Sequence, residues 1–404
     1  MLGPLPQQCD VEQCLKKWQQ GNGTTTIDSD NHRMLVFESE TSCSFLLMPE
    51  YTLVEHVDTI AADLSSQDFI GIDTEFMREK TFFAELCLVQ ISTEDSIYCV
   101  DPLIAPGMQQ FWDTLMESSW VVHSARQDIE VIYQAAERMP KRLFDTQIAA
   151  GLLGFAPQMG YANLVSELFG VDIPKTHTRA NWSKRPLAGD LLQYAAEDVQ
   201  YLLPAWQSLA EALDKKGRLA WAEEDSAQLL KPALYDIDPK LAINRLKGAR
   251  KLRGRHRAAA DRLATWRESQ ALRVNRPRQW IVKDATLIET AYRLPESIGA
   301  LQEIEGLPAA LVRRSGKILL EVIAASDQDD VSYRPPSAPG EAQKVLLKTM
   351  QKKVADCADD LGLAAETVAS KKDLSAVIIG GNRESRIFDG WRREIIGDDL
   401  LQML

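Results

Sequence analysis

Strand-like segments occupy only one part of this chain, and their distribution limits the possible folds more than any other feature. Three apolar segments, FIGIDTEF (69–76), AELCLVQIS (84–92) and SIYCVDP (96–102), are joined by short polar turns. A fourth, SWVVHS (119–124), leads directly into a helical pattern. From about residue 216 onward the strand signals stop. Strands joined by tight turns and then a strand–helix unit predict an α/β domain with a mixed central sheet.

Helical patterns account for the rest of the chain. RQDIEVIYQAAER (126–138) follows the fourth strand, and further helices are expected around 145–153, 160–169 and 189–210. Helical character returns at 216 and continues to about 326. The Pro-, Ser- and Gly-rich stretch VSYRPPSAPG is typical of a linker. The predicted division of the chain is an α/β domain at 48–215, a connecting helix at 216–240, a helical domain at 241–328, a linker at 329–340 and a second helical domain at 341–404.

Residues 1–47 differ in composition from the rest of the chain. Their centre reads QQGNGTTTIDSDNH, a composition that favours disorder. Two interpretations stand: this stretch is a disordered extension, or the true start of the protein is Met48, where a well-patterned domain opens. Neither interpretation gives the stretch a function.

Composition and charge narrow the class of protein. No apolar run approaches the roughly 18 residues of a membrane span, and no secretory signal opens the chain, so we expect a cytoplasmic protein. The net charge is −12, but Lys240–Lys283 holds fourteen Lys and Arg against two acids. That segment therefore carries 14 − 2 = +12, and the remainder −12 − 12 = −24. One basic module on an acidic protein is compatible with a nucleic-acid partner.

Acidic residues occur at unusual positions in the predicted α/β domain. Asp73 and Glu75 are two positions apart on a strand, so both project from the same face, roughly 7 Å apart along the backbone. A solvent-facing edge strand is the alternative, although the hydrophobic FIGI before them disfavours it. Asp198 lies one helical turn after Tyr194. Asp128 opens the helix after the fourth strand, where an acid also simply suits a helix N-terminus.

Four carboxylates in one cleft would repel one another unless cations compensated them. Oxygen ligands of this kind suit Mg²⁺ or Mn²⁺ rather than zinc. Two such ions about 4 Å apart form a known clamp for displacement at phosphorus. The carboxylates alone therefore indicate a metal and a phosphate, but not which substrate.

Three short motifs carry a family resemblance. DTEF (73–76), HSARQD (123–128) and YAAED (194–198) resemble the motifs of the DEDD exonuclease superfamily, and the Tyr-x-x-x-Asp spacing is that of its tyrosine subclass. LCLVQIS, LFDTQIAAGLLG and NWSKRPL look like ribonuclease D, and the resemblance extends over 48–404. The family usually has Ser-Asp-Trp where this chain has Ala180-Asn181-Trp182, which puts loop contacts in doubt but not the metal site.

The resemblance implies a ribonuclease H-like exonuclease domain followed by two all-α HRDC domains, small helical modules that bind nucleic acid. It implies that Asp73, Glu75, Asp128 and Asp198 hold two divalent metals, with Asp73 bridging them and Asp128 acting through water. Tyr194 would orient the attacking water, because a phenol is a poor base at neutral pH. The implied activity is 3′→5′ trimming of tRNA precursors and other small stable RNAs by a monomer, with release of 5′-mononucleotides.

Several residues are candidates for RNA contact. Phe76 would wedge against the terminal base or serve as a core aromatic, and His123 would contact the terminal nucleotide or close the end of its strand. Lys175 and Arg185 flank the Ala180-Asn181-Trp182 loop and would touch phosphates or remain solvated. The basic run of the first helical domain adds a group of arginines and two aromatic residues for stacking. The arginines are Arg250, Arg253 and Arg257. The aromatic residues are Trp280 and Trp266, although Trp266 lies on the apolar stripe of a helix and fits a core position better.

Two other functions remain open from the sequence. A 3′→5′ exonuclease acting mainly on DNA would use the same carboxylates, since nothing in such a site announces recognition of the 2′-hydroxyl. A non-catalytic RNA-binding adaptor would keep the fold alone, although all five functional positions are filled. Paired assays on RNA and DNA, and the activity of an Asp73→Ala variant, separate these possibilities.

Overall fold

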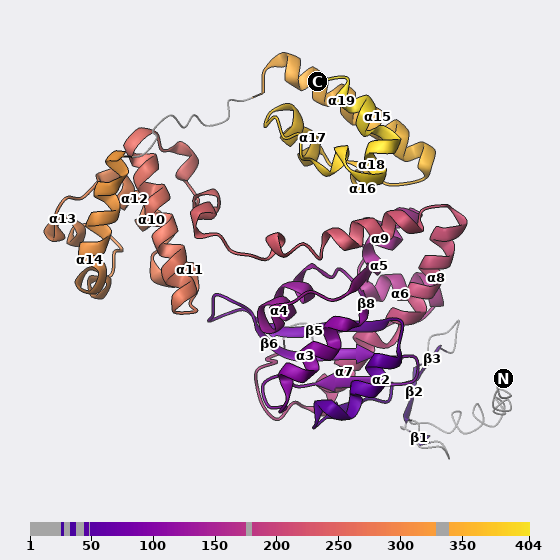
Figure 1. The fold of residues 1–404 in the computed structure, drawn as a ribbon. Coiled ribbons are helices and arrows are strands. Elements are labelled where there is room, and N and C mark those ends of the chain that lie inside the picture. The colour runs from indigo at the N-terminus through magenta and orange to yellow at the C-terminus, as the bar shows by residue number, and fades with distance from the viewer. Residues whose placement is uncertain (1–25, 28–32, 38–43, 48, 175–179, 329–338) are drawn as a thin grey trace.

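The chain forms an α/β domain followed by two separate helical domains (Figure 1). The structure is a computed structural model. Its side chains are described from residue 49 onward, within the ranges that follow. The described residues are 26–27, 33–37, 44–47, 49–174, 180–328 and 339–404.

A six-stranded mixed sheet organises the α/β domain, with strand order β4-β7-β6-β5-β8-β9. The central strand β5 pairs antiparallel with β6 on one side and parallel with β8 on the other. The catalytic candidates Asp73 and Glu75 are therefore on a strand with neighbours on both sides, which excludes the edge-strand alternative. The strands are β4 (Thr52–Val54), β5 (Ile70–Met77), β6 (Glu85–Ser92), β7 (Ile97–Val100), β8 (Ser119–Val122) and β9 (Arg142–Asp145).

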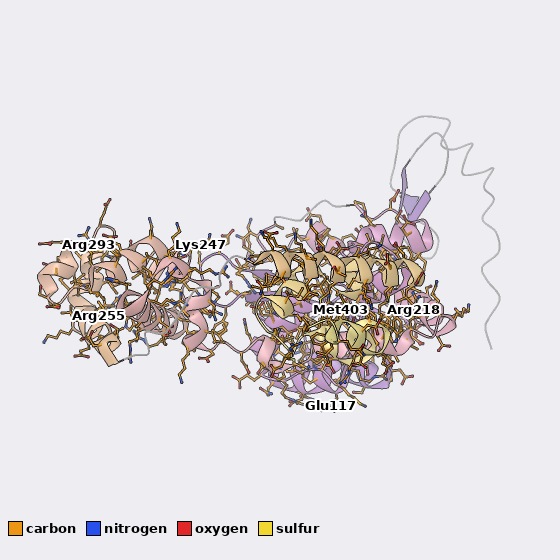
Figure 2. All side chains as sticks on the ribbon, turned by 90° about the horizontal axis from the view of Figure 1, so that it is seen from above. Glu117, Arg218, Lys247, Arg255, Arg293 and Met403 are labelled. Carbon is orange, nitrogen blue, oxygen red and sulfur yellow. The ribbon has the colours of Figure 1, made fainter. Side chains whose placement is uncertain are left out.

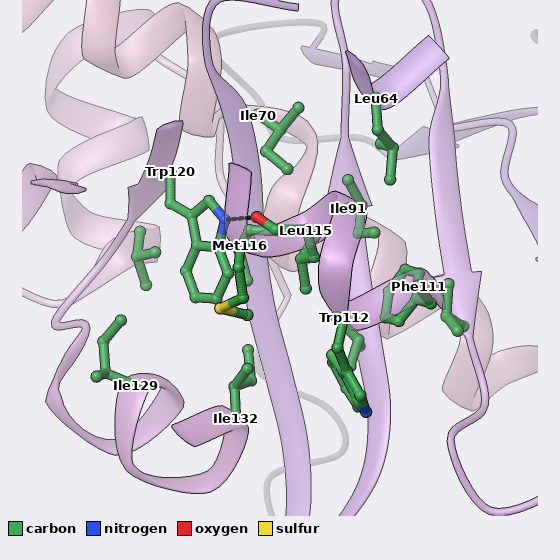
Figure 3. Packing of buried hydrophobic residues seen from close by; sticks show 14 of the residues in the cluster. Leu64, Ile70, Ile91, Phe111, Trp112, Leu115, Met116, Trp120, Ile129 and Ile132 are labelled. Carbon is green, nitrogen blue, oxygen red and sulfur yellow. Dashed lines mark hydrogen bonds between the residues drawn. The ribbon is translucent and has the colours of Figure 1, made fainter. Parts of the chain in front are cut away.

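Helices cover both faces of this sheet. On one face, alternate β5 and β6 residues such as Ile72 and Ile91 meet the apolar sides of α3 and α4. Figure 3 shows this core, where the Trp120 indole donates a hydrogen bond of 2.9 Å to the Leu115 carbonyl. The other face carries Leu88 against Leu192 and other residues of α7. The helices of the domain are α2 (Ala61–Ser66), α3 (Met108–Glu117), α4 (Arg126–Ala136), α5 (Thr146–Leu153), α6 (Tyr161–Phe169), α7 (Gly189–Gln200) and α8 (Leu202–Lys215).

The first helical domain is built around the long helix α10. Its alanine-rich inner side and Trp266 are buried against the helices that follow, so Trp266 belongs to the core. The helix α9 (Leu219–Gln228) and a 3₁₀ segment at Pro239–Arg245 connect this domain to the sheet domain. Its helices are α10 (Gly254–Arg273), α11 (Arg278–Ile281), α12 (Asp284–Arg293), α13 (Ile298–Gln302) and α14 (Ala309–Ala324).

The C-terminal helical domain packs on the α/β domain through α9. Trp391 stacks on Trp221 with ring centroids 4.5 Å apart, and Arg392 forms two hydrogen bonds with the Asp225 carboxylate, at 2.5 and 2.7 Å. Figure 2 views these C-terminal helices in front of the α/β domain, with the first helical domain to one side. The helices are α15 (Glu341–Leu361), α16 (Ala365–Val368), α17 (Lys371–Ile378), α18 (Gly390–Arg392) and α19 (Asp398–Leu401).

The predicted elements and the observed ones agree in most places. The four predicted strands are β5, β6, β7 and β8, whereas the two edge strands β4 and β9 were not predicted. The helix expected over 189–210 is two helices, α7 and α8, which meet at Tyr201. The segment 1–47 was interpreted as a disordered extension or as residues before a true start at Met48, and its described residues form three short strands of an antiparallel sheet. They are β1 (Thr26–Ile27), β2 (Arg33–Phe37) and β3 (Ser44–Leu47).

Two further expectations concern the linker between the helical domains and a possible membrane span. The predicted linker at 329–340 lies outside the described residues except for its last two positions. Among the described helices, none is both long enough and apolar enough to cross a membrane.

Candidate active site

The strand β5 presents Asp73 and Glu75 on the face that α7 covers. Both side chains are half-buried. Asp73 pairs across the sheet with Gln90, and residues directly opposite in an antiparallel pair project from the same face. The close approach of α8 to this strand requires a glycine two residues earlier: a Cβ atom on Gly71 would lie 2.2 Å from the Ser92 hydroxyl and 3.0 Å from Leu202 Cβ.

Helix α7 brings Tyr194 and Asp198 over the same face. Its apolar residues, including Leu192 and Ala195, are buried against the sheet, and the Ser92 hydroxyl donates a 2.9 Å hydrogen bond to the Val199 carbonyl. Tyr194 and Asp198 are one helical turn apart, and the phenol donates a hydrogen bond to the carboxylate. The spacing read from the sequence therefore places the tyrosine and the acid as predicted.

Asp128 reaches the site by a different route. It lies in the first turn of α4, is almost fully buried, and accepts a hydrogen bond of 2.5 Å from the Thr74 hydroxyl. Thr74 lies between Asp73 and Glu75, so its side chain projects to the opposite face of β5 and links that face to α4. No local pattern in the sequence indicates this role, because the two partners are 54 residues apart.

The turn that begins α4 is held by a residue that the sequence analysis did not single out. Asp145, at the end of β9, accepts hydrogen bonds from the amides of Ser124 and Ala125 at 3.1 and 2.8 Å. It also caps α5 by accepting from the amides of Gln147 and Ile148. One buried carboxylate thus fixes the start of α4, and with it the position of Asp128.

The four carboxylates share one electrostatic environment. Burial, followed by the charges of Asp128, Asp198 and Glu75, raises the pKa of Asp73 well above its usual range. Burial and then the charges of Asp198 and Asp128 raise the pKa of Glu75 to about 8.

Asp128 and Asp198 are perturbed in the same direction. Burial raises the pKa of Asp128 to about 7 against the stabilising hydrogen bond from Thr74. Burial likewise raises the pKa of Asp198 to about 7, and here the hydrogen bond from Tyr194 opposes the shift. All four groups would therefore ionise more readily if positive charge were placed among them.

The oxygens of the four carboxylates are the kind of ligand that a hard divalent cation prefers, although these side chains do not converge on a single ion position. Among the described residues, no three histidine, cysteine or acidic side chains are close enough to ligate one ion together. Mutual repulsion and the Thr74–Asp128 hydrogen bond both favour this spread arrangement. Carboxylate oxygens with raised pKa values nevertheless fit Mg²⁺ or Mn²⁺, whose charge would offset the repulsion.

A second observation supports a site for a polar group beside Asp73. The side chain of Gln90 is fully buried, and neither of its amide atoms has a hydrogen-bond partner among the described residues. Leaving such atoms unpaired costs about 1–3 kcal/mol each. Gln90 is thus a polar residue at the carboxylate face that the sequence analysis did not identify.

Two of the predicted RNA contacts, Phe76 and His123, follow Glu75 on β5 and the end of β8, respectively. Phe76 is half-buried and packs against the main core, while the Arg78 guanidinium lies 5.7 Å from its ring. Both ring nitrogens of His123 are hydrogen-bonded: Nδ1 to the Thr146 hydroxyl and Nε2 to the Met159 carbonyl, each at 2.9 Å. Burial lowers its pKa, so His123 is a neutral strand-end histidine.

The predicted loop cations occupy different environments. Lys175 lies outside the described residues. Arg185 does not extend into solvent: its guanidinium is 2.5 Å from the buried Asp101 carboxylate and donates to the carbonyls of Cys87 and Trp182 at 2.8 and 2.6 Å. Those bonds use the donors that a phosphate would need.

The predicted arginines of the first helical domain are only partly available. Arg250 and Arg253 are both exposed, and Arg253 also donates to the carbonyls of Arg250 and Leu252, both at 2.8 Å. Arg257 is half-buried. Three other arginines of this segment are held in ion pairs, because Arg245 and Arg278 both pair with the buried Glu268, and Arg267 pairs with Asp284.

Family models define the class of protein as a 3′-5′ exonuclease that carries a helical HRDC domain. A 3′-5′ exonuclease family matches residues 52–214, and the HRDC domain family matches 256–323. Ribonuclease D of Gluconacetobacter diazotrophicus is 36% identical over 367 residues, which are 87% of this chain and 91% of that protein. Ribonuclease D of Acidiphilium cryptum is 37% identical over 374 residues, or 88% and 93%.

A solved structure extends the similarity to the whole fold. The crystal structure of Escherichia coli RNase D superposes with a TM-score of 0.79 at 25% identity, covering 88% of this chain and 98% of that one. The chain belongs to the ribonuclease D family. It is a 3′-5′ exoribonuclease, a hydrolase that acts on RNA, and its family uses divalent metals. This identification excludes the non-catalytic adaptor.

Proposed function

We propose that this enzyme trims the 3′ ends of tRNA precursors and other small structured RNAs, and releases 5′-mononucleotides one at a time. The observation that carries the proposal is the set of four interacting carboxylates with Tyr194 hydrogen-bonded to one of them. The similar Escherichia coli enzyme is described as an exoribonuclease involved in structured RNA processing, which supports this substrate class.

Asp73, Glu75, Asp128 and Asp198 would hold two Mg²⁺ or Mn²⁺ ions. When bound, these ions supply charge stabilisation at the phosphate and acidify water. Asp73 is suited to the most central position, because its pKa responds to the other three acids. Asp128 enters the site with one oxygen already bonded to Thr74, which suits contact through water.

Tyr194 orients the attacking water rather than abstracting a proton from it. Burial and the neighbouring acids Asp198, Glu75 and Asp73 raise the pKa of the phenol further above its usual value. The hydroxyl therefore remains a hydrogen-bond donor throughout the neutral range, and one lone pair of its oxygen is left to position a water at the terminal phosphodiester.

The direct test is incubation of the full chain with a 3′-extended tRNA precursor and a matched DNA strand, with Mg²⁺ or with a chelator. We expect a ladder of RNA products that shorten by single nucleotides, dependent on metal, and slower degradation of DNA. Cleavage within the chain, activity in chelator, or a preference for DNA would reject the proposal. Asp73→Asn is the matched control and should abolish the ladder.

We further expect the enzyme to act as a monomer in the cytoplasm. Light scattering behind a sizing column should give a mass near 45.2 kDa. A stable dimer at micromolar concentration would contradict this expectation.

A further inference from the structure

The hairpin that follows Glu75 meets the first helical domain. Residues 78–84 connect β5 to β6, and in Figure 1 this loop extends toward α11. The Asn275 side-chain oxygen accepts hydrogen bonds from the amides of Phe82 and Phe83 at 3.0 and 3.1 Å. Arg276 donates to the Lys80 carbonyl at 3.2 Å. The turn between α10 and α11 is thus bonded to the hairpin backbone at three points.

A buried acid fixes the next contact. Glu268 is 1% exposed and accepts two hydrogen bonds from Arg278, at 2.5 and 2.8 Å. So held, the Arg278 guanidinium lies 4.4 Å from the centre of the Phe82 ring. Charge-assisted hydrogen bonds and a cation–π contact therefore set the position of α11 relative to the hairpin.

Trp280 projects from this junction into solvent. Its side chain is 59% exposed, and the Arg276 guanidinium lies 5.9 Å from its ring. Val274, which follows the last residue of α10, is 43% exposed. We name these residues the junction surface: Lys80, Phe82, Val274, Arg276, Arg278 and Trp280. Arg276 and Lys80 are exposed cations, and the exposed acids on the hairpin are Glu79 and Glu85.

We propose that the junction surface is a binding subsite for single-stranded RNA, upstream of the nucleotide being removed. One base stacks on Trp280, and the adjoining phosphates contact Arg276 and Lys80. An exposed indole flanked by cations has the chemistry of such a platform, because every base offers a π face and every linkage carries negative charge. This assignment rests on the proposed function and deepens it.

The position of the junction surface relative to the carboxylates fits this role. Phe82 follows Glu75 by seven residues, so the two lie no more than about 24 Å apart even if the chain were fully extended. A single-stranded RNA whose 3′ end reaches Glu75 therefore needs only a few nucleotides to reach Trp280. The hairpin is the physical link between the two sites.

Binding measurements test the subsite directly. In an Asp73→Asn background, which prevents degradation, the dissociation constant for a labelled 12-nucleotide single-stranded RNA is measured by fluorescence anisotropy in Mg²⁺. Trp280→Ala should weaken binding about tenfold, the loss of one stacked base. Tyr292→Ala is the matched control, since Tyr292 is 62% exposed in the same domain but stacks on His256. It should change affinity less than about twofold.

Salt dependence separates phosphate contact from stacking. Arg276→Gln should reduce the slope of log affinity against log salt by about 0.7, the value for one phosphate of a single strand. Trp280→Ala should leave that slope unchanged. Undiminished affinity in Trp280→Ala, an equal loss in Tyr292→Ala, or an unchanged slope in Arg276→Gln would overturn the subsite.

The proposed function is tested separately with the unsubstituted chain and a diribonucleotide. Cleavage of this short substrate supports the exonuclease site whatever the junction surface does. If the unsubstituted chain cleaves neither diribonucleotide nor 12-mer, the proposed function fails. If it cleaves both and Trp280→Ala cleaves the 12-mer at the same rate, only the subsite fails.

Discussion

Raising the pH should destabilise the metal-free enzyme, because its site carboxylates hold protons more tightly when folded. The pKa of Glu75 is about 8 in the folded chain against a usual 4.5, and those of Asp128 and Asp198 are about 7 against 3.8. An acid whose pKa is higher in the folded state than in the unfolded state stabilises the fold. This stabilisation is fully present below the unfolded-state pKa and is lost as the pH rises through the folded-state pKa. These three groups therefore reduce the free energy of unfolding as the pH rises from about 4 to 8.

The window from pH 6.5 to 8 isolates this effect. Burial lowers the pKa of His123, so His123 has the opposite effect, which lies mostly below pH 6.5 and offsets only a small part of the loss above it. From the linkage relation, the three groups together lose about 3 kcal/mol across the window, and about half of that loss comes from Glu75. The total of about 3 kcal/mol corresponds to a fall of about 6–12 °C in the melting temperature of a domain of this size.

Thermal melts of the full chain in chelator, followed by circular dichroism at pH 6.5, 7.2 and 8, measure the fall. Added Mg²⁺ should restore most of the lost stability at pH 8 and little at pH 6.5, because ions favour the ionised carboxylates. Asp198→Asn removes one titrating group and one charge acting on Glu75, so it should reduce the loss by about 1 kcal/mol or more. A melting temperature in chelator that stays flat or rises between pH 6.5 and 8 would refute the reasoning.

Three substitutions test individual contacts. Tyr194→Phe should lower kcat for RNA by about 10- to 100-fold through poorer positioning, with metal affinity kept; loss of metal binding would instead indicate a structural role. Gln90→Leu should raise the free energy of unfolding in urea by about 1–3 kcal/mol, since it removes buried amide atoms without partners, and a destabilised variant would contradict this. Arg392→Gln leaves the Asp225 carboxylate largely buried without its cationic partner, at a cost of about 3–5 kcal/mol. Hydrogen exchange across 341–404 should then accelerate, and unchanged exchange would show that the contact does not hold the C-terminal domain.

The sequence predicted the parts of the site that depend on local geometry. Asp73 and Glu75 follow from the two-residue period of a strand, and Tyr194 with Asp198 follow from the helical turn. The central α/β domain and the helical domains follow from where strand patterns stop. Each of these inferences needs only neighbours along the chain.

Long-range contacts were beyond sequence reasoning. Thr74 bonds Asp128 across 54 residues, and Arg185 pairs with Asp101 across 84, so neither partner is visible in a local pattern. Gln90 looks like one polar residue in an apolar strand, and only the structure reveals that its amide is buried and unpaired. The edge strands β4 and β9 escape as well, because β4 is only three residues long and β9 contains just two apolar residues, Leu143 and Phe144.

Manganese binding by the full chain tests the central claim most directly. Electron paramagnetic resonance of free Mn²⁺ at pH 8 counts the ions removed from solution by the unsubstituted chain and by Asp73→Asn. We predict two bound ions per unsubstituted chain and at most one, weakly held, in Asp73→Asn. Equal binding by both chains, or none by either, would contradict a metal centre built on these carboxylates.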